Sequence, residues 1–124
     1  MTATIKAVEI TEVAELAPEK FVPDDPEDFV CTFGLTIGPT GGEGGELFYV
    51  TVCTPRRLEK LCERDGFVWG RHHLIVPFYD FGRICSIIRR FVNNASGLDW
   101  TEIGPKLARL GAWEFEDYRG PCES

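Results

Sequence analysis

Cysteine and histidine are the residue types in this chain best suited to covalent chemistry. A thiolate nucleophile needs a nearby base and an orienting group, and Cys53, Cys62 or Cys85 could be paired in this way with His72 or His73. However, Cys62 and Cys85 fall at apolar positions of periodic segments, where cysteine acts as a small buried hydrophobe. The adjacent histidines would also point to opposite faces of a strand. We therefore expect no catalytic residues and no enzymatic activity.

The motifs of metal and cofactor sites are also missing from the sequence. A metal site needs three or four convergent ligands, whereas the sequence has neither H-x-x-x-H nor C-x-x-C spacing. The glycine-rich run Gly41-Gly-Glu-Gly-Gly45 lacks the spacing of phosphate-binding loops and carries a carboxylate. We expect no metal and no cofactor, and we interpret this run as the tip of a hairpin.

Charged and aromatic side chains offer three possible binding surfaces. A run of carboxylates between Phe21 and Phe29 could bind a protein through charge complementarity, although such a run is more often soluble surface. A small basic patch and an aromatic anchor are the alternatives, with solvated helix faces and core packing as the simpler explanations. The acidic run comprises Asp24, Asp25, Glu27 and Asp28. The basic residues are Arg56, Arg57, Lys60, Arg64, Arg89 and Arg90, and the aromatic ones are Trp69, Phe78 and Tyr79.

Three strands are predicted in the first half of the chain. Residues 4–10 form the first, and the proline-punctuated stretch 11–28 then forms an ordered loop. Residues 29–37 alternate between apolar and small or polar side chains, which is the period of a strand with one face on a core. Residues 47–53 complete an antiparallel hairpin, whose tip carries Glu43 and Glu46.

The second half of the chain is predicted to contain three helices and two strands. Thr54-Pro55 caps a helix that stops at Gly66, and residues 70–79 form a strand. Asp80 caps a helix whose inward residues fall at helical spacing, namely Phe81, Ile84, Cys85, Ile88, Phe91 and Val92. A capping box at residues 99–102 starts a third helix, in which Pro105 predicts a kink or a delayed start, and residues 113–118 form a last strand.

The order of these elements favours the α+β class. Hairpin connections without regular β-α-β alternation predict a mainly antiparallel sheet with helices packed on one face. The chain has 124 residues, of which 44% are hydrophobic, and it contains no repeat or linker. We expect one domain that covers residues 1–124.

Composition limits the classes of partner. The formal net charge is −7, and the first 46 residues hold ten acidic and two basic side chains. Nucleic acids and anionic lipids bind to basic surfaces, so we expect neither as a partner. The expected partner is a basic protein. No segment has the length of a membrane span or the pattern of a secretory signal, and five cysteines form no disulfide framework, so we expect a cytoplasmic location.

Four stretches of the chain together resemble the immunity protein 8 family of bacterial polymorphic toxin systems. They are Phe33-Gly-Leu-Thr-Ile-Gly-Pro-Thr-Gly-Gly-Glu-Gly-Gly-Glu46, Val52-Cys-Thr-Pro-Arg56, Gly70-Arg-His-His-Leu-Ile-Val76 and Trp113-Glu-Phe-Glu-Asp-Tyr118. The blocks follow the family's order and spacing over most of the chain. The sequence departs from the family near Trp100, where Gly104-Pro105 replaces strong helix formers.

The resemblance implies an immunity protein that protects bacteria in competition by binding and neutralising one cognate toxin C-terminal domain in a stoichiometric complex. Many such toxins attack nucleic acids and carry basic clefts, which an acidic inhibitor can occupy by mimicking phosphate charge. The expected toxin-binding residues are Asp24, Asp25, Glu27, Asp28, Glu43 and Glu46. We expect a monomer or a weak homodimer. The alternatives are a regulatory or scaffold protein-binding module and, further, a small Cys/His enzyme.

Overall fold

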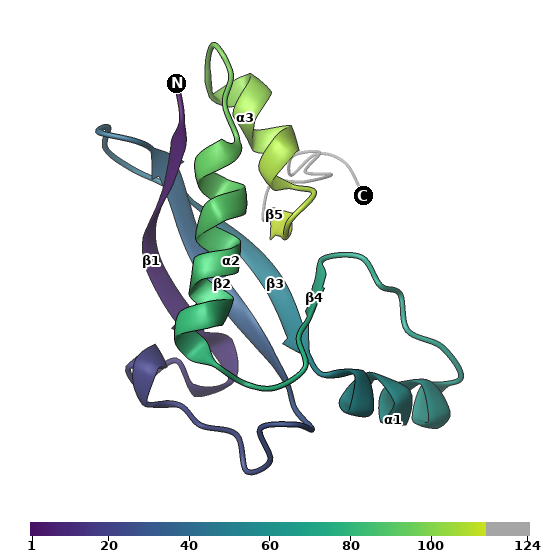
Figure 1. Cartoon of the computed structure of the whole chain (residues 1–124). Coiled ribbons are helices and arrows are strands. Elements are labelled where there is room, and N and C mark those ends of the chain that lie inside the picture. Colours follow the sequence, from purple (N-terminus) through teal and green to yellow (C-terminus); the bar gives the residue numbers. More distant parts are fainter. Residues whose placement is uncertain (114–124) are drawn as a thin grey trace, which may run out of the picture.

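Three strands that follow one another in the sequence form the centre of the sheet. The computed structural model describes residues 1–113. Strands β1 (Ala3–Ile10), β2 (Val30–Pro39) and β3 (Glu46–Cys53) pair as antiparallel neighbours (Figure 1). The β2–β3 register places Val30 opposite Cys53 at one end and Ile37 opposite Glu46 at the other. The predicted hairpin is therefore confirmed.

Two short strands share the remaining edge of β3. Strand β4 (His73–Ile75) runs parallel to β3, and β5 (Ala112–Trp113) runs antiparallel to it. The prediction of a strand over residues 70–79 is wrong in extent, because His72 has a φ of 58° and so cannot continue a strand. Of the last predicted strand, residues 114–118 lie outside the described part of the chain.

Helices α2 (Phe81–Asn94) and α3 (Trp100–Leu107) cover one face of the sheet (Figure 1). Asp80 begins α2 as its N-cap, with its Oδ1 atom accepting a hydrogen bond from the Arg83 amide at 3.1 Å. Alternate residues of β2 and β3 and one side of each helix enter a single apolar core, which includes Phe33, Leu35, Val50, Ile84, Ile88, Ile103 and Leu107. The α+β fold class, with a mainly antiparallel sheet, is confirmed.

Helix α3 begins where its cap predicts. The Asp99 carboxylate accepts hydrogen bonds from the amides of Thr101 and Glu102, and the Glu102 carboxylate accepts one from the Leu98 amide at 2.9 Å. The alternative of a delayed start is therefore wrong. Pro105 lies inside the helix, which ends two residues later, at Leu107.

Helix α1 (Pro55–Asp65) stands beside the sheet rather than on it (Figure 1). Thr54 is its N-cap, and Gly66, with a φ of 86°, ends it in the left-handed conformation that favours glycine. No residue within Pro55–Asp65 is buried. The prediction that helices pack on one face of the sheet thus holds for α2 and α3. Helix α1 is instead held by polar contacts with Asp28, just before β2.

Candidate functional site

The acidic residues predicted to bind a partner lie at two opposite ends of the sheet. Asp24, Asp25, Glu27 and Asp28 belong to the acidic loop, which we define as residues 11–28, immediately before β2. Glu43 and Glu46 lie at the hairpin tip, which we define as residues 40–46, after β2 (Figure 1). With a rise of about 3.3 Å per residue, the ten residues of β2 separate the two groups by roughly 30 Å. The structure does not bring the six residues into one site.

The exposed part of the acidic loop is held by backbone contacts. Asp25 Oδ1 accepts a hydrogen bond from the Glu27 amide at 2.9 Å, and the Asp25 carbonyl accepts one from the Asp28 amide at 3.0 Å. The Pro26 carbonyl accepts a hydrogen bond from the Tyr79 amide at 2.7 Å. Asp24, Asp25 and Glu27 are all exposed. Three carboxylates are therefore presented to solvent on a fixed turn.

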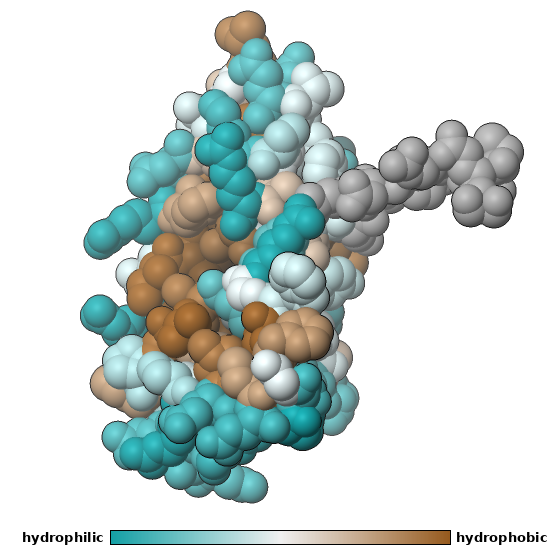
Figure 2. Space-filling model, turned by 90° about the vertical axis from the view of Figure 1, so that its right-hand side faces the viewer, coloured by the Kyte–Doolittle hydropathy of each residue, from teal (hydrophilic) through white to brown (hydrophobic). Residues whose placement is uncertain are grey.

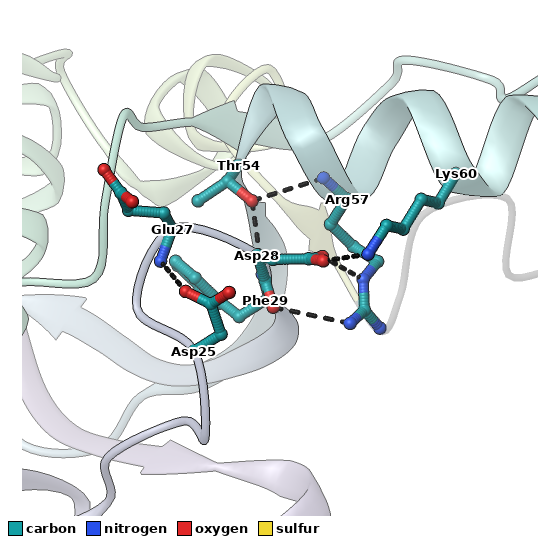
Figure 3. A network of polar contacts seen from close by, with 7 residues as sticks. All are labelled: Asp25, Glu27, Asp28, Phe29, Thr54, Arg57 and Lys60. Carbon is teal, nitrogen blue, oxygen red and sulfur yellow. Dashed lines mark hydrogen bonds and ion pairs between the residues drawn. The ribbon is translucent and has the colours of Figure 1, made fainter.

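Asp28 differs from its neighbours because its side chain is only 7% exposed. One carboxylate oxygen accepts a hydrogen bond from Arg57 Nε at 2.6 Å, and the other accepts one from Lys60 Nζ (Figure 3). The hydrogen bonds from Lys60 and then Arg57 lower the pKa of this carboxyl below its usual value. Asp28 therefore ties the acidic loop to α1 and leaves little of its charge for an outside partner.

Thr54 completes the connection between the acidic loop and α1. Its hydroxyl oxygen accepts hydrogen bonds from the amides of Phe29 at 3.2 Å and Arg57 at 3.4 Å (Figure 3). Its own amide donates to the Phe29 carbonyl at 3.2 Å. Thr54 is completely buried, so one hydroxyl fixes both the start of β2 and the start of α1.

The hairpin tip presents one exposed carboxylate rather than two. Glu43 is exposed, whereas Glu46 is half-buried and accepts a hydrogen bond from Trp113 Nε1 at 2.5 Å. The Trp113 ring stacks on Phe48, with ring centroids 5.8 Å apart. It also lies against Gly104 of α3, where an added Cβ would be 2.9 Å from the indole. Glu46 thus supports the packing of α3 on the sheet.

Each acidic group borders a shallow hollow of the surface. Glu27, Pro55, Arg56 and Pro77 line one of about 270 Å³. Glu43 and Glu46 line another, of about 220 Å³, together with Pro39, Gly45 and Trp100. Both hollows combine charge with flat apolar side chains, which suits contact with a protein surface better than capture of a small molecule.

Three of the four thiols in the described residues are poorly placed for nucleophilic chemistry, and the fourth, Cys62, is half-buried. Cys31, Cys53 and Cys85 are buried, and burial raises the pKa of each thiol, to about 12 for Cys31. Ring nitrogens of His72 and His73 instead lie 2.7 Å from backbone carbonyl oxygens. Among residues 1–113, no three His, Cys, Asp or Glu side chains are grouped as metal ligands, and Cys122 lies outside this range.

The aromatic surface gains one residue that sequence analysis missed. Trp69 is 80% exposed and forms an edge-to-face pair with Phe67, which is 61% exposed, with ring centroids 6.0 Å apart. Phe78 is half exposed, whereas Tyr79 packs edge-to-face on Phe29 in the core. The signal that could have identified Phe67 is its position just after the Gly66 helix stop, outside any apolar period.

Comparison with known proteins identifies one family. The model of the family described as Immunity protein 8 matches residues 3–118. No curated protein and no solved structure matches the chain. Separately, none of the helices within residues 1–113 has the length and apolar character needed to span a bilayer.

Proposed function

Because the chain belongs to the immunity protein 8 family, we propose that it binds the C-terminal domain of one cognate toxin and neutralises it by forming a stoichiometric complex. The observation that carries this proposal is the extent of the family match, which covers every strand and helix within residues 1–113. Inhibition by binding requires no catalytic group. The raised thiol pKa values and the engaged histidine rings favour this function over a Cys/His enzyme.

We further propose that the toxin carries a basic cleft of the kind that binds nucleic acid, and that the acidic loop occupies it. Asp24, Asp25 and Glu27 support this role because they are exposed and lie on a fixed turn. A fixed turn loses little conformational freedom on binding, and clustered carboxylates accelerate the approach of a basic partner. Asp28 and Glu46 contribute mainly by holding the fold, since their carboxylates already have internal partners.

Co-expression with the toxin domain encoded immediately upstream tests the function itself. We expect the cells to survive and the two proteins to co-purify at equal stoichiometry, because a blocking complex must be tight and complete. If the toxin still kills and no complex is isolated, the immunity role is rejected, and the chain is better explained as a regulatory or scaffold module.

Charge removal tests the surface. The triple variant Asp24→Asn/Asp25→Asn/Glu27→Gln should lower the association rate about tenfold and reduce its salt dependence, because these are exposed charges that act mainly on encounter. The matched control is Glu43→Gln, which removes an exposed carboxylate at the other end of β2. An unchanged salt dependence in the triple variant would show that the acidic loop is not the contact.

A further inference from the structure

Phe67 and Trp69 form the most prominent exposed aromatic pair in the described part of the chain. They lie on the aromatic loop, which we define as residues 66–72 between α1 and β4. A tryptophan exposed to 80% leaves a large apolar surface in water, and burying that surface in an interface is favourable. Figure 2, which views the molecule from the right-hand side of Figure 1, shows a group of hydrophobic side chains above a hydrophilic lower end.

The aromatic loop is anchored at both of its ends. At the first, the Gly66 amide donates to the Cys62 carbonyl at 2.7 Å. At the second, the His72 carbonyl accepts a hydrogen bond from the Thr51 amide at 2.9 Å, and His72 Nε2 lies 2.7 Å from the Ala108 carbonyl oxygen. His72 adopts a φ of 58°, which is costly for a residue other than glycine and is maintained only where the surroundings enforce it. The two ends of the loop that carries Phe67 and Trp69 are therefore fixed before a partner binds.

Helix α1 connects the aromatic loop to the acidic loop. Its 11 residues span about 16 Å at 1.5 Å per residue. A standard interface covers about 800 Å² on each partner, a patch roughly 30 Å across, and so can include both loops. The hairpin tip lies at the opposite end of β2, roughly 30 Å beyond the acidic loop (Figure 1). One standard contact that uses the aromatic loop therefore includes the acidic loop and excludes the tip.

The charges of α1 do not oppose a basic partner as strongly as its composition suggests. Arg57 and Lys60 are paired with Asp28, and Arg64 is paired with Asp65 at 2.8 Å. The Asp28 carboxylate offsets only one of the two cations that it binds, and Arg56 lines the same hollow as Glu27. Even so, α1 has four cations and three anions, so that it and the four carboxylates of residues 24–28 together have a formal net charge of −3. The net potential of the patch is therefore governed by the acidic loop.

We infer that Phe67 and Trp69 are the apolar anchor of the toxin interface, which extends from the acidic loop across α1 to the aromatic loop. This inference rests on the proposed function. The partner is the cognate toxin domain, with an apolar pocket for Trp69 beside its basic cleft. Interface hot spots typically contain a buried tryptophan surrounded by a polar, charged rim. The aromatic residue supplies affinity, and the charges raise the association rate and fix the relative orientation of the partners.

The test compares toxin binding by wild type, Trp69→Ala and Phe67→Ala, with Leu98→Ala as the matched control. Leu98 is 87% exposed and lies on the α2–α3 connection, at the end of the molecule away from α1 (Figure 1). The probe is the upstream-encoded toxin domain, made as a catalytically inactive variant, and the measurement is Kd by calorimetry. We expect Trp69→Ala to weaken binding at least 30-fold, mainly through faster dissociation, and Leu98→Ala to change it less than twofold.

The outcomes separate the inference from the proposed function. If the wild-type protein does not bind the toxin, the proposed function fails. If wild type binds and Trp69→Ala binds equally well, the function stands and the anchor is rejected. Thermal unfolding of each variant excludes a folding defect, and we expect no shift for Trp69→Ala because its ring contacts little besides Phe67. A Leu98→Ala loss equal to that of Trp69→Ala would also overturn the inference.

Discussion

Replacing Thr54 by valine removes the one side-chain oxygen that joins the start of β2 to the start of α1. Valine has nearly the same shape, so the core packing around this completely buried residue is preserved. Two hydrogen bonds are lost, those from the amides of Phe29 and Arg57. The loss of a threonine N-cap costs about 1 kcal/mol. Within residues 1–113, the Phe29 amide donates only to Thr54, and Phe29 is buried. An unsatisfied buried donor costs about 1–3 kcal/mol.

The two contributions predict that Thr54→Val lowers the free energy of unfolding by about 3 kcal/mol. For a chain of this size, that corresponds to a fall in Tm of roughly 12 °C. Urea unfolding followed by circular dichroism gives the free energy, and differential scanning calorimetry gives the Tm. Because the same hydroxyl positions the acidic loop and α1, toxin association should also slow in the folded variant.

Thr54→Ser is the control, since it keeps the acceptor oxygen and removes only a buried methyl group. Its expected cost is about 1 kcal/mol. Equal loss in the two variants would mean that packing of the methyl group, rather than the hydrogen bonds, sets the stability. A Thr54→Val protein within 1 kcal/mol of wild type would refute the assignment of this hydroxyl as the link between β2 and α1.

Three further predictions test separate contacts. The first compares two glycine replacements by urea unfolding. Gly82→Ala in α2 should raise the free energy of unfolding by about 0.5 kcal/mol, because the added Cβ meets only one oxygen at 3.7 Å. Gly104→Ala should lower it by about 1–2 kcal/mol because the added Cβ strikes Trp113, and changes of the same sign in both variants would contradict this packing. The pKa of Asp28 is lowered in the folded protein, so its charge stabilises the fold above about pH 4, and this contribution is lost as pH falls through the folded-state pKa. The difference in the free energy of unfolding between wild type and Asp28→Asn should therefore close in acid titrations. A constant difference would show that the ion pairs contribute nothing. Native Cys31, whose pKa burial raises to about 12, should resist iodoacetamide at pH 7.5 until urea is added, and rapid native alkylation identified by peptide mass spectrometry would disprove its burial.

The elements with local signals could be predicted from the sequence. Thr54, Asp80 and Asp99 mark the helix starts through their caps, and the structure places each cap as expected. The extent of β4 could not be predicted, because it depends on parallel pairing with β3 and on the contact of His72 with Ala108, which is 36 residues away. Phe91 was expected to face inward and is 40% exposed, since α2 needs only a narrow stripe to cover the sheet.

The candidate site was predicted by composition but not by arrangement. Acidic residues are evident in the sequence, yet only the fold shows that the Asp28 carboxylate is paired with two cations of α1. These are Arg57 and Lys60, which lie 29 and 32 residues further along the chain. The same holds for Glu46, whose partner Trp113 is 67 residues away. Local patterns contain no information about such pairings, so the division between exposed and internally bonded carboxylates had to come from the structure.

The neighbour-to-neighbour order of β1, β2 and β3 has a consequence for the nascent chain. Each strand can pair as soon as the next leaves the ribosome, so the meander can assemble before the remainder of the protein is made. Its apolar face, with Phe33 and Val50, is covered only when α2 follows. The roughly 40 residues from the end of β3 to the end of α2 take about 2–8 s to synthesise at 5–20 residues per second. During this interval the apolar side of the sheet is open, and a pause in translation before α2 would lengthen its exposure to chaperones and to aggregation.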